Sequence, residues 1–569
     1  MNVTLLLRRL FLSAALALSI HVHADETLTD TAALTAPSYT LYNMSFSGVA
    51  ADGGTPFWIT SHTHGRADEA PTDTAALTAP SYTLYNMSSS GVAADGGTPF
   101  WITSHTHGRM PTDIDGAGGY VQAGIRHVGR LAERWRWEAG LKLVAATPRL
   151  GSHFFVQEAY AELTYRDRLA LSIGSREWQR ERLKGDGGAR CDRPTSPDAA
   201  LSSGDLLLSP NARPIPEIAL YTPRFTVVPL TGGWLLAGGD FAVGRSFDTD
   251  YLRAAVAPER HYVRDVLWHR KALYLQLKDP RQACLPLTFT LGIRHMAQWG
   301  GTSTQPKMGR QPMSVKDFLR IVLGQSGGND ATVSDQINVL GNHYGTFDFR
   351  LDYTGERFGV AAYYQHFWED RSGIEWYNGL DGLMGVCVDL KTFPQVRHVV
   401  VERLGTMDQS GPFHFIQYDH KKYPGYGGGA DNYYNNGEYT TGASYFGRAI
   451  GSPLLRSPAY NADGAPGFLH NRIRAWHVGA EGDVVGPWAW RARLTALRSF
   501  GTPYAPTLRP ADDVSVCVDV RYRLEGRSAR RDVKPSSGWV FTVSLATDRG
   551  DLMGRRTGVA LTVSRWGRW

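Results

Sequence analysis

The stretch that decides the fold is Val514-Ser-Val-Cys-Val-Asp-Val-Arg-Tyr-Arg-Leu524. Apolar and polar residues alternate along it without interruption, which is the side-chain period of a β-strand. The same pattern recurs at residues 135–143 and 488–496. These stretches reach the ~9–11 residues that a tilted strand needs to cross a bilayer, whereas strands of soluble sheets usually have about 5–6. The sequence therefore predicts long antiparallel strands.

The composition narrows the class of protein. With 569 residues and a formal charge of +6, the chain is too long for one ordinary soluble domain. Hydrophobic residues make up 42%, which excludes wholesale disorder. No run of eighteen apolar residues occurs beyond the extreme N-terminus, so a bundle of membrane helices is excluded. The 62 Gly, 16 Trp and 26 Tyr favour a large, turn-rich β-structure that meets a membrane interface.

The N-terminus has the pattern of a signal peptide. Arg8 and Arg9 form a charged region, residues 10–20 are apolar, and Val22-His23-Ala24 fits the small-residue cleavage rule. We expect cleavage before Asp25 and export of the mature protein. No cysteine lies near this site, which disfavours a lipoprotein.

A tandem repeat follows the signal peptide. Residues 24–66 and 67–109 are the same 43-residue segment, differing only at Thr27/Ala70, Leu28/Pro71 and Phe46/Ser89. Two copies are too few for a solenoid. Each copy ends in a strand-like piece, at residues 56–60 and 99–103. We expect residues 25–66 to be a loosely held extra copy and residues 67–569 to form the folded body.

The histidines of the repeat and the cysteines predict no metal site or cofactor. His62, His64, His105 and His107 sit in two S-H-T-H-G-R segments, but two neutral imidazoles without a carboxylate or thiolate make a poor metal site. They are expected to be ordinary strand-end histidines. The cysteines stand more than ninety residues apart with no C-x-x-C pair, so isolated thiols are favoured and a long-range disulfide stays open. They are Cys191, Cys284, Cys387 and Cys517.

Alternation alone does not say which face of the sheet is wet. A soluble sandwich buries its apolar face, whereas an outer-membrane barrel shows that face to lipid and fills its lumen with polar groups. Export favours the barrel, as do Trp135 and Trp488 at strand starts and the terminal Trp569. The predicted fold is all-β, a large closed transmembrane antiparallel β-barrel in the outer membrane. Its partners would include outer-membrane lipid and no nucleic acid.

One segment breaks the β pattern. Ser314 can cap a helix with Asp317 three residues later, and Gly324 can end it. A second short helix is expected at residues 333–340. Such helices near 314–340 suggest a plug, or a rim element on the periplasmic side.

Several motifs stand in a fixed order between about residues 98 and 569. The longest is Leu201-Ser-Ser-Gly-Asp-Leu-Leu-Leu-Ser-Pro-Asn-Ala-Arg-Pro-Ile-Pro-Glu-Ile218. The others are A-Q-W-G-G (297–301), N-V-L-G-N-H (338–343), Y-Y-Q-H (363–366) with E-D-R-S-G (369–373), N-G-L-D-G (378–382), Q-S-G-P (409–412), D-N-Y-Y-N-N (431–436) and I-G-S-P (450–453). Together they make the chain resemble the Wzi family of outer-membrane capsule-assembly proteins.

The resemblance implies a fold and a function. The fold would be a closed barrel, with eighteen strands in the studied members and a small helical plug. The function would be that of a lectin, which binds capsular or other surface polysaccharide and supports capsule assembly or attachment. The duplicated N-terminus departs from the family's pattern.

Enzymatic signals are weak. Glu369 and Asp370 are adjacent, so on a strand they would point to opposite faces, which makes a poor glycosidase pair. We predict no catalysis, while a diffusion porin and an outer-membrane hydrolase remain as alternatives. Two prolines in residues 211–216 predict a rigid turn or a lumen-facing loop. Arg213 would there pair with a buried carboxylate or contact a ligand.

Two groups of residues carry chemistry that suits a sugar. Pyranose rings present apolar C–H faces to aromatic side chains, while Asn and Asp bind their hydroxyl groups. The predicted carbohydrate-binding residues are Trp376, Tyr377, Asn378 and Asp381 in the first group and Asp431, Asn432, Tyr433, Tyr434 and Asn435, near Asn436 and Tyr439, in the second. The alternative is that these aromatics belong to a membrane girdle or to loop packing. The sequence does not place the two groups side by side.

Overall fold

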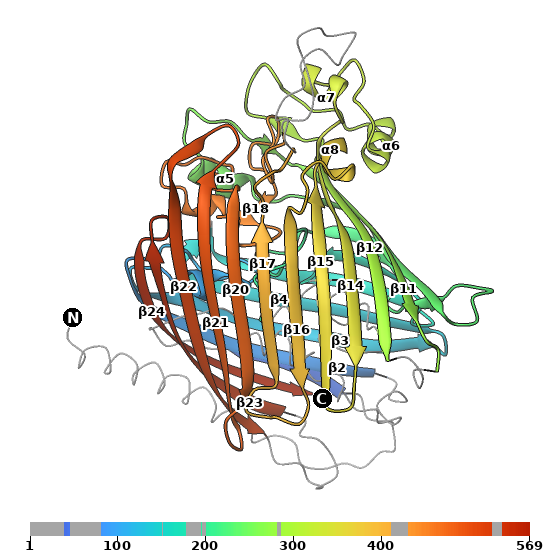
Figure 1. Ribbon diagram of the computed structural model, residues 1–569, viewed down its shortest axis with the longest axis vertical. Helices are drawn as coiled ribbons and strands as arrows, with labels where there is room; N and C mark the ends of the chain where they lie inside the picture. The colour runs from blue at the N-terminus through green and yellow to red at the C-terminus, as the bar shows by residue number, and fades with distance from the viewer. Residues whose placement is uncertain are drawn as a thin grey trace, which may run out of the picture.

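The computed structural model describes residues 39–45, 81–150, 152–177, 195, 201–281, 286–410, 431–525 and 537–568. Their strands form one sheet that closes on itself as a barrel (Figure 1). The wall strands, in order, are β2 (Ser81–Asp95), β3 (Gly116–Ala132), β4 (Trp135–Leu150), β5 (Ser152–Tyr165), β6 (Leu169–Ser175), β7 (Glu217–Tyr221), β9 (Leu235–Arg245), β11 (Leu267–Lys278), β12 (Leu287–Trp299), β14 (Asn342–Thr354), β15 (Phe358–Trp368), β16 (Gly382–Leu390), β17 (His398–Gly405), β20 (Ile473–Asp483), β21 (Trp488–Gly501), β22 (Pro506–Glu525), β23 (Ser537–Gly550) and β24 (Arg555–Arg568). The two-residue β8 (Thr226–Val227) pairs with β9 beyond the end of β7.

The wall positions number eighteen in the described part of the chain, and the first and last strands close the ring. β2 pairs antiparallel with β24 along its length, from Leu84 opposite Arg568 to Asp95 opposite Thr557. Every wall neighbour in the described residues is antiparallel. Closure leaves no open sheet edge, which a bilayer would not tolerate. The predicted closed antiparallel barrel is confirmed.

The alternation seen in the sequence separates an outer from an inner face. On β22, Val514 and Val518 are exposed on the outside, while Cys517 and Asp519 are buried on the inside. The same holds on β21, where Leu494 is exposed and Arg493 is buried. An apolar outside and a charged inside are typical of a barrel in a membrane. The strands expected near residues 135, 488 and 514 are therefore confirmed.

Aromatic side chains gather where the wall strands meet their short turns. Trp135 lies beside Tyr165 with ring centroids 4.8 Å apart, and Trp488 lies 5.0 Å from Tyr522. This position suits a girdle at a membrane–water interface. The expected terminal aromatic, Trp569, and the signal peptide lie outside the described residues.

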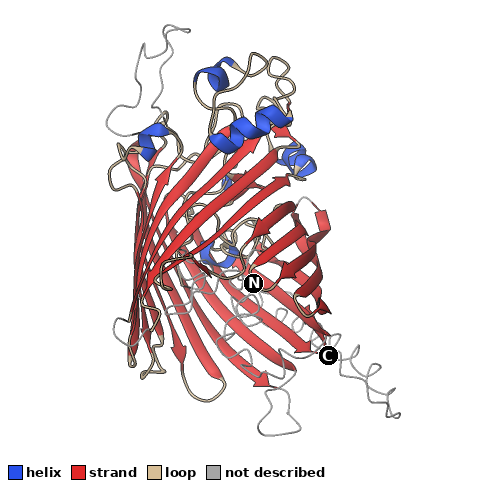
Figure 2. Ribbon diagram, turned by 90° about the vertical axis from the view of Figure 1, so that its right-hand side faces the viewer, coloured by secondary structure: helices blue, strands red, loops and turns tan. Residues whose placement is uncertain are grey.

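The two ends of the barrel differ in the length of their connections. At the end where β24 finishes, the strands are joined by turns such as residues 355–357 and 484–487. At the other end, residues 300–341 and 406–472 join neighbouring wall strands, and the helices gather there (Figures 1 and 2). Short turns are periplasmic and long loops extracellular in such barrels. The long-loop end is thus the extracellular one.

Three of the connections fold back into the lumen. They comprise residues 96–115, 201–216 and 431–472, and they contribute many buried side chains to one hydrophobic cluster that also includes inward residues of the wall. Charged contacts link them to the wall. The Arg294 guanidinium on β12 lies 2.8 Å from the carboxylate of Asp205 in the second connection and 2.5 Å from that of Asp348 on β14. The lumen is therefore filled by protein.

The strand expected at residues 99–103 is wrong. Phe100–Thr103 form the short helix α4 inside the lumen, and its four side chains are buried. The backbone N–H of Phe100 donates to the Asp548 carboxylate on β23 at 2.7 Å, and Ser104 donates to the Phe100 carbonyl at 2.7 Å. A wall carboxylate thus caps a helix that local residue preferences would not predict. α4 is the helical part of the plug.

The histidines after α4 are not at a strand end either. His105 and His107 follow α4 with φ angles of 59° and 51°, and their side chains are packed in the lumen. The His105 ring lies 5.8 Å from that of Trp101. Among the described residues no group of three potential ligands is placed to hold a metal. His62 and His64 lie outside the described residues.

The helix predicted after Ser314 is confirmed as α6 (Val315–Leu323). Ser314 and Asp317 form a capping box, and Gly324 ends the helix with a φ of 62°. The expected second helix is shorter, α7 (Val333–Ile337), because Asn338 leaves the helical conformation. Both lie at the long-loop end (Figure 1), so the expected periplasmic position is wrong.

That end also carries α5 (Thr249–Ala255), α8 (Arg371–Ile374), a 3-10 turn (Pro458–Tyr460) and the two-stranded pairs β10 (Val263–Arg264) with β13 (Thr302–Ser303) and β18 (Ser444–Tyr445) with β19 (Arg448–Ala449). No helix in the described ranges combines the length and the apolar character needed to traverse a membrane.

The second repeat copy supplies β2. A strand of the first copy, β1 (Tyr39–Ser45), runs parallel to β2 with each residue opposite its own counterpart, from Tyr39 with Tyr82 to Met44 with Met87. Both copies pair with the same residues of β24, Arg565 and Trp566. The two copies thus meet the same neighbour in the same register.

The cysteines and Arg213, whose roles the sequence left open, have defined surroundings in the structure. Cys387 on β16 and Cys517 on β22 are buried thiols, and the other two cysteines lie outside the described residues. The Arg213 guanidinium lies over two aromatic rings, 3.6 Å from the centroid of Phe155 and 4.1 Å from that of Phe446. It therefore joins the second lumen connection to β5 and to residues near β18 by cation–π contacts.

Candidate functional site

The first predicted sugar-binding group occupies the loop between α8 and β16. Trp376 has a φ of 65° and stacks on the His366 ring at 3.8 Å. Its ring also neighbours Phe349 and Tyr364, which stand on the outer face of the wall. Tyr377 is the more exposed of the pair, at 58%. Trp376 thus packs against aromatic side chains on the outer face of the wall.

The side chains of Asn378 and Asp381, unlike those of Trp376 and Tyr377, are buried. The Asn378 amide donates to the Phe367 carbonyl at 2.8 Å and to the Tyr433 hydroxyl at 2.5 Å. The Asp381 carboxylate accepts from three backbone N–H groups of residues 407–409, at 2.8–2.9 Å. Burial raises the pKa of Asp381 to about 7 against the opposing effect of these bonds. Both side chains fasten loops to each other.

The second group lies directly against the first. The backbone N–H of Tyr433 donates to the Gln409 side chain at 3.0 Å, and that of Tyr434 donates to the Glu369 carboxylate at 2.6 Å. Asp431 accepts from the Ser372 hydroxyl at 3.1 Å. Tyr433, Tyr434 and Asp431 are buried. The structure therefore brings the two groups together, and most of their polar atoms bind protein.

The asparagines of the second group bind other parts of the third lumen connection. The Asn435 amide donates to the Phe468 carbonyl at 2.8 Å. Asn432 accepts from the amide of Asn471 at 2.6 Å, and both predicted asparagines are partly exposed. The residue before Asn471 is His470, which lines a pocket. The hydrogen bond between Asn432 and Asn471 thus links the predicted group to the segment that lines the pocket.

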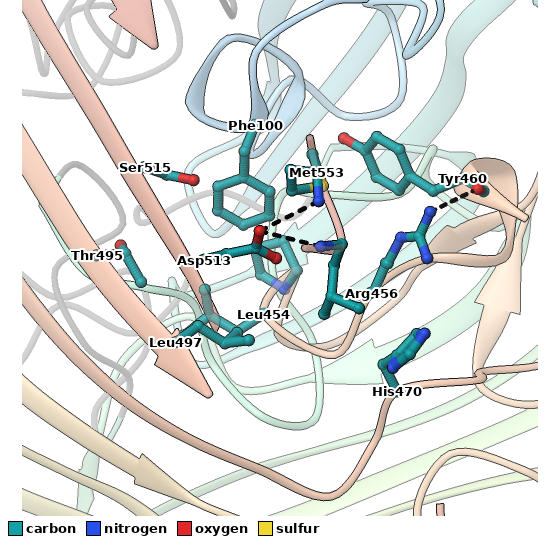
Figure 3. Close-up of a pocket in the computed structure, with 12 residues that line it drawn as sticks. Phe100, Leu454, Arg456, Tyr460, His470, Thr495, Leu497, Asp513, Ser515 and Met553 are labelled. Atoms are coloured by element: carbon teal, nitrogen blue, oxygen red, sulfur yellow. Dashed lines mark hydrogen bonds between the residues drawn. The ribbon is translucent and has the colours of Figure 1, made fainter. Parts of the chain in front are cut away.

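The pocket lies between the third lumen connection and the inner faces of β21 and β22 (Figure 3). Its volume is about 30 Å³. The apolar lining comes from α4, the loop and the β23–β24 turn, and the polar lining includes Arg456, Tyr460, His470, Asp513 and Ser515. A wall with both apolar and polar patches is typical of a site that orients a small polar ligand.

The polar atoms of the pocket are only partly satisfied within the protein. Arg456 donates through one terminal nitrogen to the Tyr460 carbonyl at 2.8 Å, while its buried Nε has no hydrogen-bond partner. Asp513 accepts the backbone N–H groups of Leu552 and Met553, each at 3.2 Å. Burial lowers the pKa of His470 to about 4, helped by the nearby Arg456 charge. His470 is therefore neutral at pH 7 and can both donate and accept.

Three arginine side chains lie around the Tyr460 ring. The guanidinium carbons of Arg448, Arg456 and Arg556 lie 5.7, 5.9 and 5.4 Å from its centroid. Its hydroxyl bonds that of Thr103 at 2.6 Å. Arg456, which lines the pocket, therefore offers a cationic donor beside the Tyr460 ring. Sequence reasoning missed these residues because no motif or spacing links positions 456, 470 and 513.

The adjacent carboxylates of Glu369 and Asp370 are each engaged by the protein. Glu369 accepts the Tyr434 N–H and Asp370 caps α8 through Ser372, so both carboxylates have structural partners. A G-x-S-x-G string occurs at residues 324–328. It follows the end of α6 instead of joining a strand to a helix, so it is not a nucleophile elbow.

Comparison with known proteins gives a match to one family model. Residues 202–457 match the family model of the capsule assembly protein Wzi. The resemblance to the Wzi family is confirmed. The Wzi match is shorter than the span of residues 98–569 over which the resemblance was expected. It includes the second lumen connection and the part of the third connection that reaches Arg456.

Solved structures give weaker likenesses. Escherichia coli Wzi, a carbohydrate-binding β-barrel of the outer membrane involved in group 1 capsule assembly, is 14% identical, with a TM-score of 0.48 and coverage of 88% of this chain and 86% of that one. Pseudomonas aeruginosa OpdK is 10% identical with a TM-score of 0.40, covering 86% and 99%. Salmonella typhi OmpF is 8% identical with a TM-score of 0.35, covering 86% and 97%. None of the curated protein sequences matches the chain.

Proposed function

We propose that this protein is a non-catalytic outer-membrane barrel that binds surface polysaccharide at its extracellular mouth and supports capsule assembly or attachment. The observation that carries the proposal is that the Wzi-matching residues 202–457 include chain that fills the lumen. A filled lumen disfavours a diffusion porin. Escherichia coli Wzi is described as carbohydrate-binding and involved in capsule assembly, which agrees with this reading.

The binding surface proposed for the polysaccharide is the pocket of Figure 3 and the adjoining asparagines. Arg456 and His470 offer hydrogen-bond donors for sugar hydroxyl or carboxylate oxygens. The apolar lining suits the C–H face of a pyranose ring. A cavity of about 30 Å³ is too small for a whole pyranose, so it would hold only an exocyclic group of a chain that lies across the mouth. Tyr377 and Trp376 stay as a second proposed contact on the same end of the barrel.

The first test is a glycan array probed with the purified full chain, followed by titration with the polysaccharides that bind. Replacing Arg456 by alanine should weaken binding by roughly tenfold, because a hydrogen bond to a charged group contributes about 1.5–3 kcal/mol. His470→Ala should weaken it less, since the ring is neutral. Arg253→Ala on α5 is the matched control, because Arg253 is an exposed arginine of the same end whose side chain meets only Asp250 among the ion pairs found there.

The outcomes separate the function from the site. If the Arg456→Ala variant binds glycan normally, the binding site lies elsewhere on the mouth, and the lectin function still holds. Failure to bind any surface glycan, with a normal capsule in a deletion strain, would overturn the function. Turnover of glycan or lipid substrates would replace it by the hydrolase alternative.

A further inference from the structure

Helix α6 lies on the outside of the barrel. Its Phe318 ring meets three rings of the outer wall, with centroids 6.3 Å from Phe241, 5.7 Å from His269 and 5.5 Å from Trp299. The ammonium group of Lys271 on β11 donates to the carbonyl of Val322 in the last turn of the helix. A cation at this end of a helix is favourable. These contacts fix α6 flat against β9, β11 and β12.

The helix shows a second apolar face, away from the wall. Ile321 is fully buried against the wall, but Val315, Leu319 and Leu323 are 79%, 55% and 66% exposed. Their spacing of four residues places them along one stripe of the helix. An exposed stripe of this kind on a short amphipathic helix is typical of one that lies in a membrane interface.

The height of α6 on the wall matches the edge of the lipid-facing band. Going up β11, the outward side chains change from Leu277, Leu275 and Leu273 to Lys271 and His269. α6 covers this change, since its contacts are with His269 and Lys271. In Figure 1 α6 stands at the upper margin of the strands. The exposed stripe of α6 therefore continues the apolar surface of the barrel at its upper boundary.

The surroundings of the stripe are basic. Lys307, Arg310 and Lys316 are exposed in the segment that leads into and begins the helix. The carboxylate of Asp317 is engaged by Arg320 at 2.8 Å and by the helix cap. The segment of residues 304–324 thus presents net positive charge beside an apolar stripe. This combination fits phosphate groups above acyl chains.

We propose that α6 is an interfacial helix that docks on the lipid of the extracellular leaflet, with Val315, Leu319 and Leu323 in the acyl boundary and the basic residues on anionic headgroups. The helix would fix the depth of the barrel beneath the loops that carry the polysaccharide pocket. This inference does not depend on the proposed function. It rests on contacts and exposure at the outer wall.

The test places an environment-sensitive fluorophore on α6 in vesicles. The full chain, with its cysteines replaced by alanine, receives a single cysteine in place of Leu319 or Leu323 and is reconstituted in vesicles of zwitterionic and anionic phospholipid. Lipids with a nitroxide near the headgroup serve as quenchers. Leu273→Cys on the lipid-facing wall is the reference for lipid, and Arg253→Cys on α5 is the reference for water. Heat-modifiable gel mobility verifies that each variant is folded.

The expected result is blue-shifted emission from residues 319 and 323 with loss of fluorescence to the nitroxide lipids, as for residue 273. Replacing Lys307, Arg310 and Lys316 by glutamine should reduce the preference for anionic vesicles by roughly fivefold for each residue. Emission like that of residue 253 would overturn the proposal. Blue-shifted emission without quenching would also overturn it, because the stripe would then be covered by protein, such as a second copy of the chain.

Discussion

At the scale of single residues, Asp335 is the carboxylate whose ionisation we expect to matter most for the extracellular loops. It sits in α7, caps the Gly341 N–H at 3.1 Å, and faces Glu438, which accepts from Thr332 at 3.0 Å. Burial and the neighbouring Glu438 charge raise the pKa of Asp335 to about 7. The protonated form is thus favoured in the folded loop.

This shift predicts a pH dependence with a definite sign. The folded pKa of Asp335 is above the unfolded value of 3.8, so its stabilising contribution is fully present below pH 3.8 and is lost as the pH rises to about 7. The loss amounts to at most about 4 kcal/mol, at ~1.4 kcal/mol for each pH unit. Hydrogen exchange of the amides of residues 333–341, corrected for intrinsic rates, should show falling protection over this range.

Asp335→Asn provides the control for that experiment. The amide oxygen can still accept from Gly341 but carries no charge at any pH. The variant should keep its protection as the pH rises, and Asp317→Asn, which removes the carboxylate of the α6 capping box, should retain the wild-type slope. An identical pH slope in Asp335→Asn would contradict the assignment.

At the scale of elements, the tandem repeat offers two candidates for one position in the wall. Arg565 and Trp566 of β24 pair with both β1 and β2. We predict that deleting residues 25–66 leaves folding and glycan binding unchanged, because β2 with its neighbours β24 and β3 remains. The measurement is heat-modifiable gel mobility of the outer-membrane protein, with the glycan titration beside it.

The reciprocal deletion tests whether the first copy can supply the same wall strand. Removing residues 67–109 joins the first copy to Met110 and yields a protein that differs from the other at the three positions where the copies differ and by one alanine, because deleting residues 25–66 leaves Ala24 in front of Ala67. Ser89 neighbours Ser90, whose hydroxyl meets that of Thr562 inside the barrel at 3.0 Å, so position 89 points outward. Phe46 would there face lipid, and this barrel should also fold. Failure of both deletions would show that the wall needs both copies.

Helices α6 and α4 differ in how far the sequence predicts them. α6 was predictable because its cap is local: Ser314, Asp317 and Gly324 are set by spacing alone. α4 was not, because its first N–H is held by Asp548, which is 448 residues away. The sequence alone therefore suggested a strand for the apolar residues 99–103, because their helical conformation depends on contacts within the assembled lumen.

At the scale of the whole molecule, the filled lumen predicts low permeability. Three connections pack inside the wall, and buried pairs such as Arg294 with Asp205 hold them there. Liposomes that contain the protein should swell in small sugars at a rate close to that of protein-free vesicles. A general porin in the same lipid serves as the positive control. Swelling comparable to that porin would contradict a filled lumen and favour the channel alternative.

The sequence by itself determined the barrel and its orientation of faces. Alternation over ten or more residues divides the side chains between two faces, because successive side chains of a strand point to opposite faces. The export signal and the tryptophan positions favoured the barrel with its apolar face outside, and Val514 and Cys517 fall where that places them. The capped helix α6 and the Wzi resemblance were likewise readable. The reason is that each rests on residues close together along the chain.

Only the tertiary structure decided what fills the barrel and what lines its mouth. The two predicted sugar-binding groups meet through Asn378 and Tyr433, but that contact buries them. The pocket combines Arg456, His470 and Asp513, which stand on a loop and a distant strand. Such groups become neighbours only when the connections fold into the closed wall, and no spacing along the chain encodes that proximity.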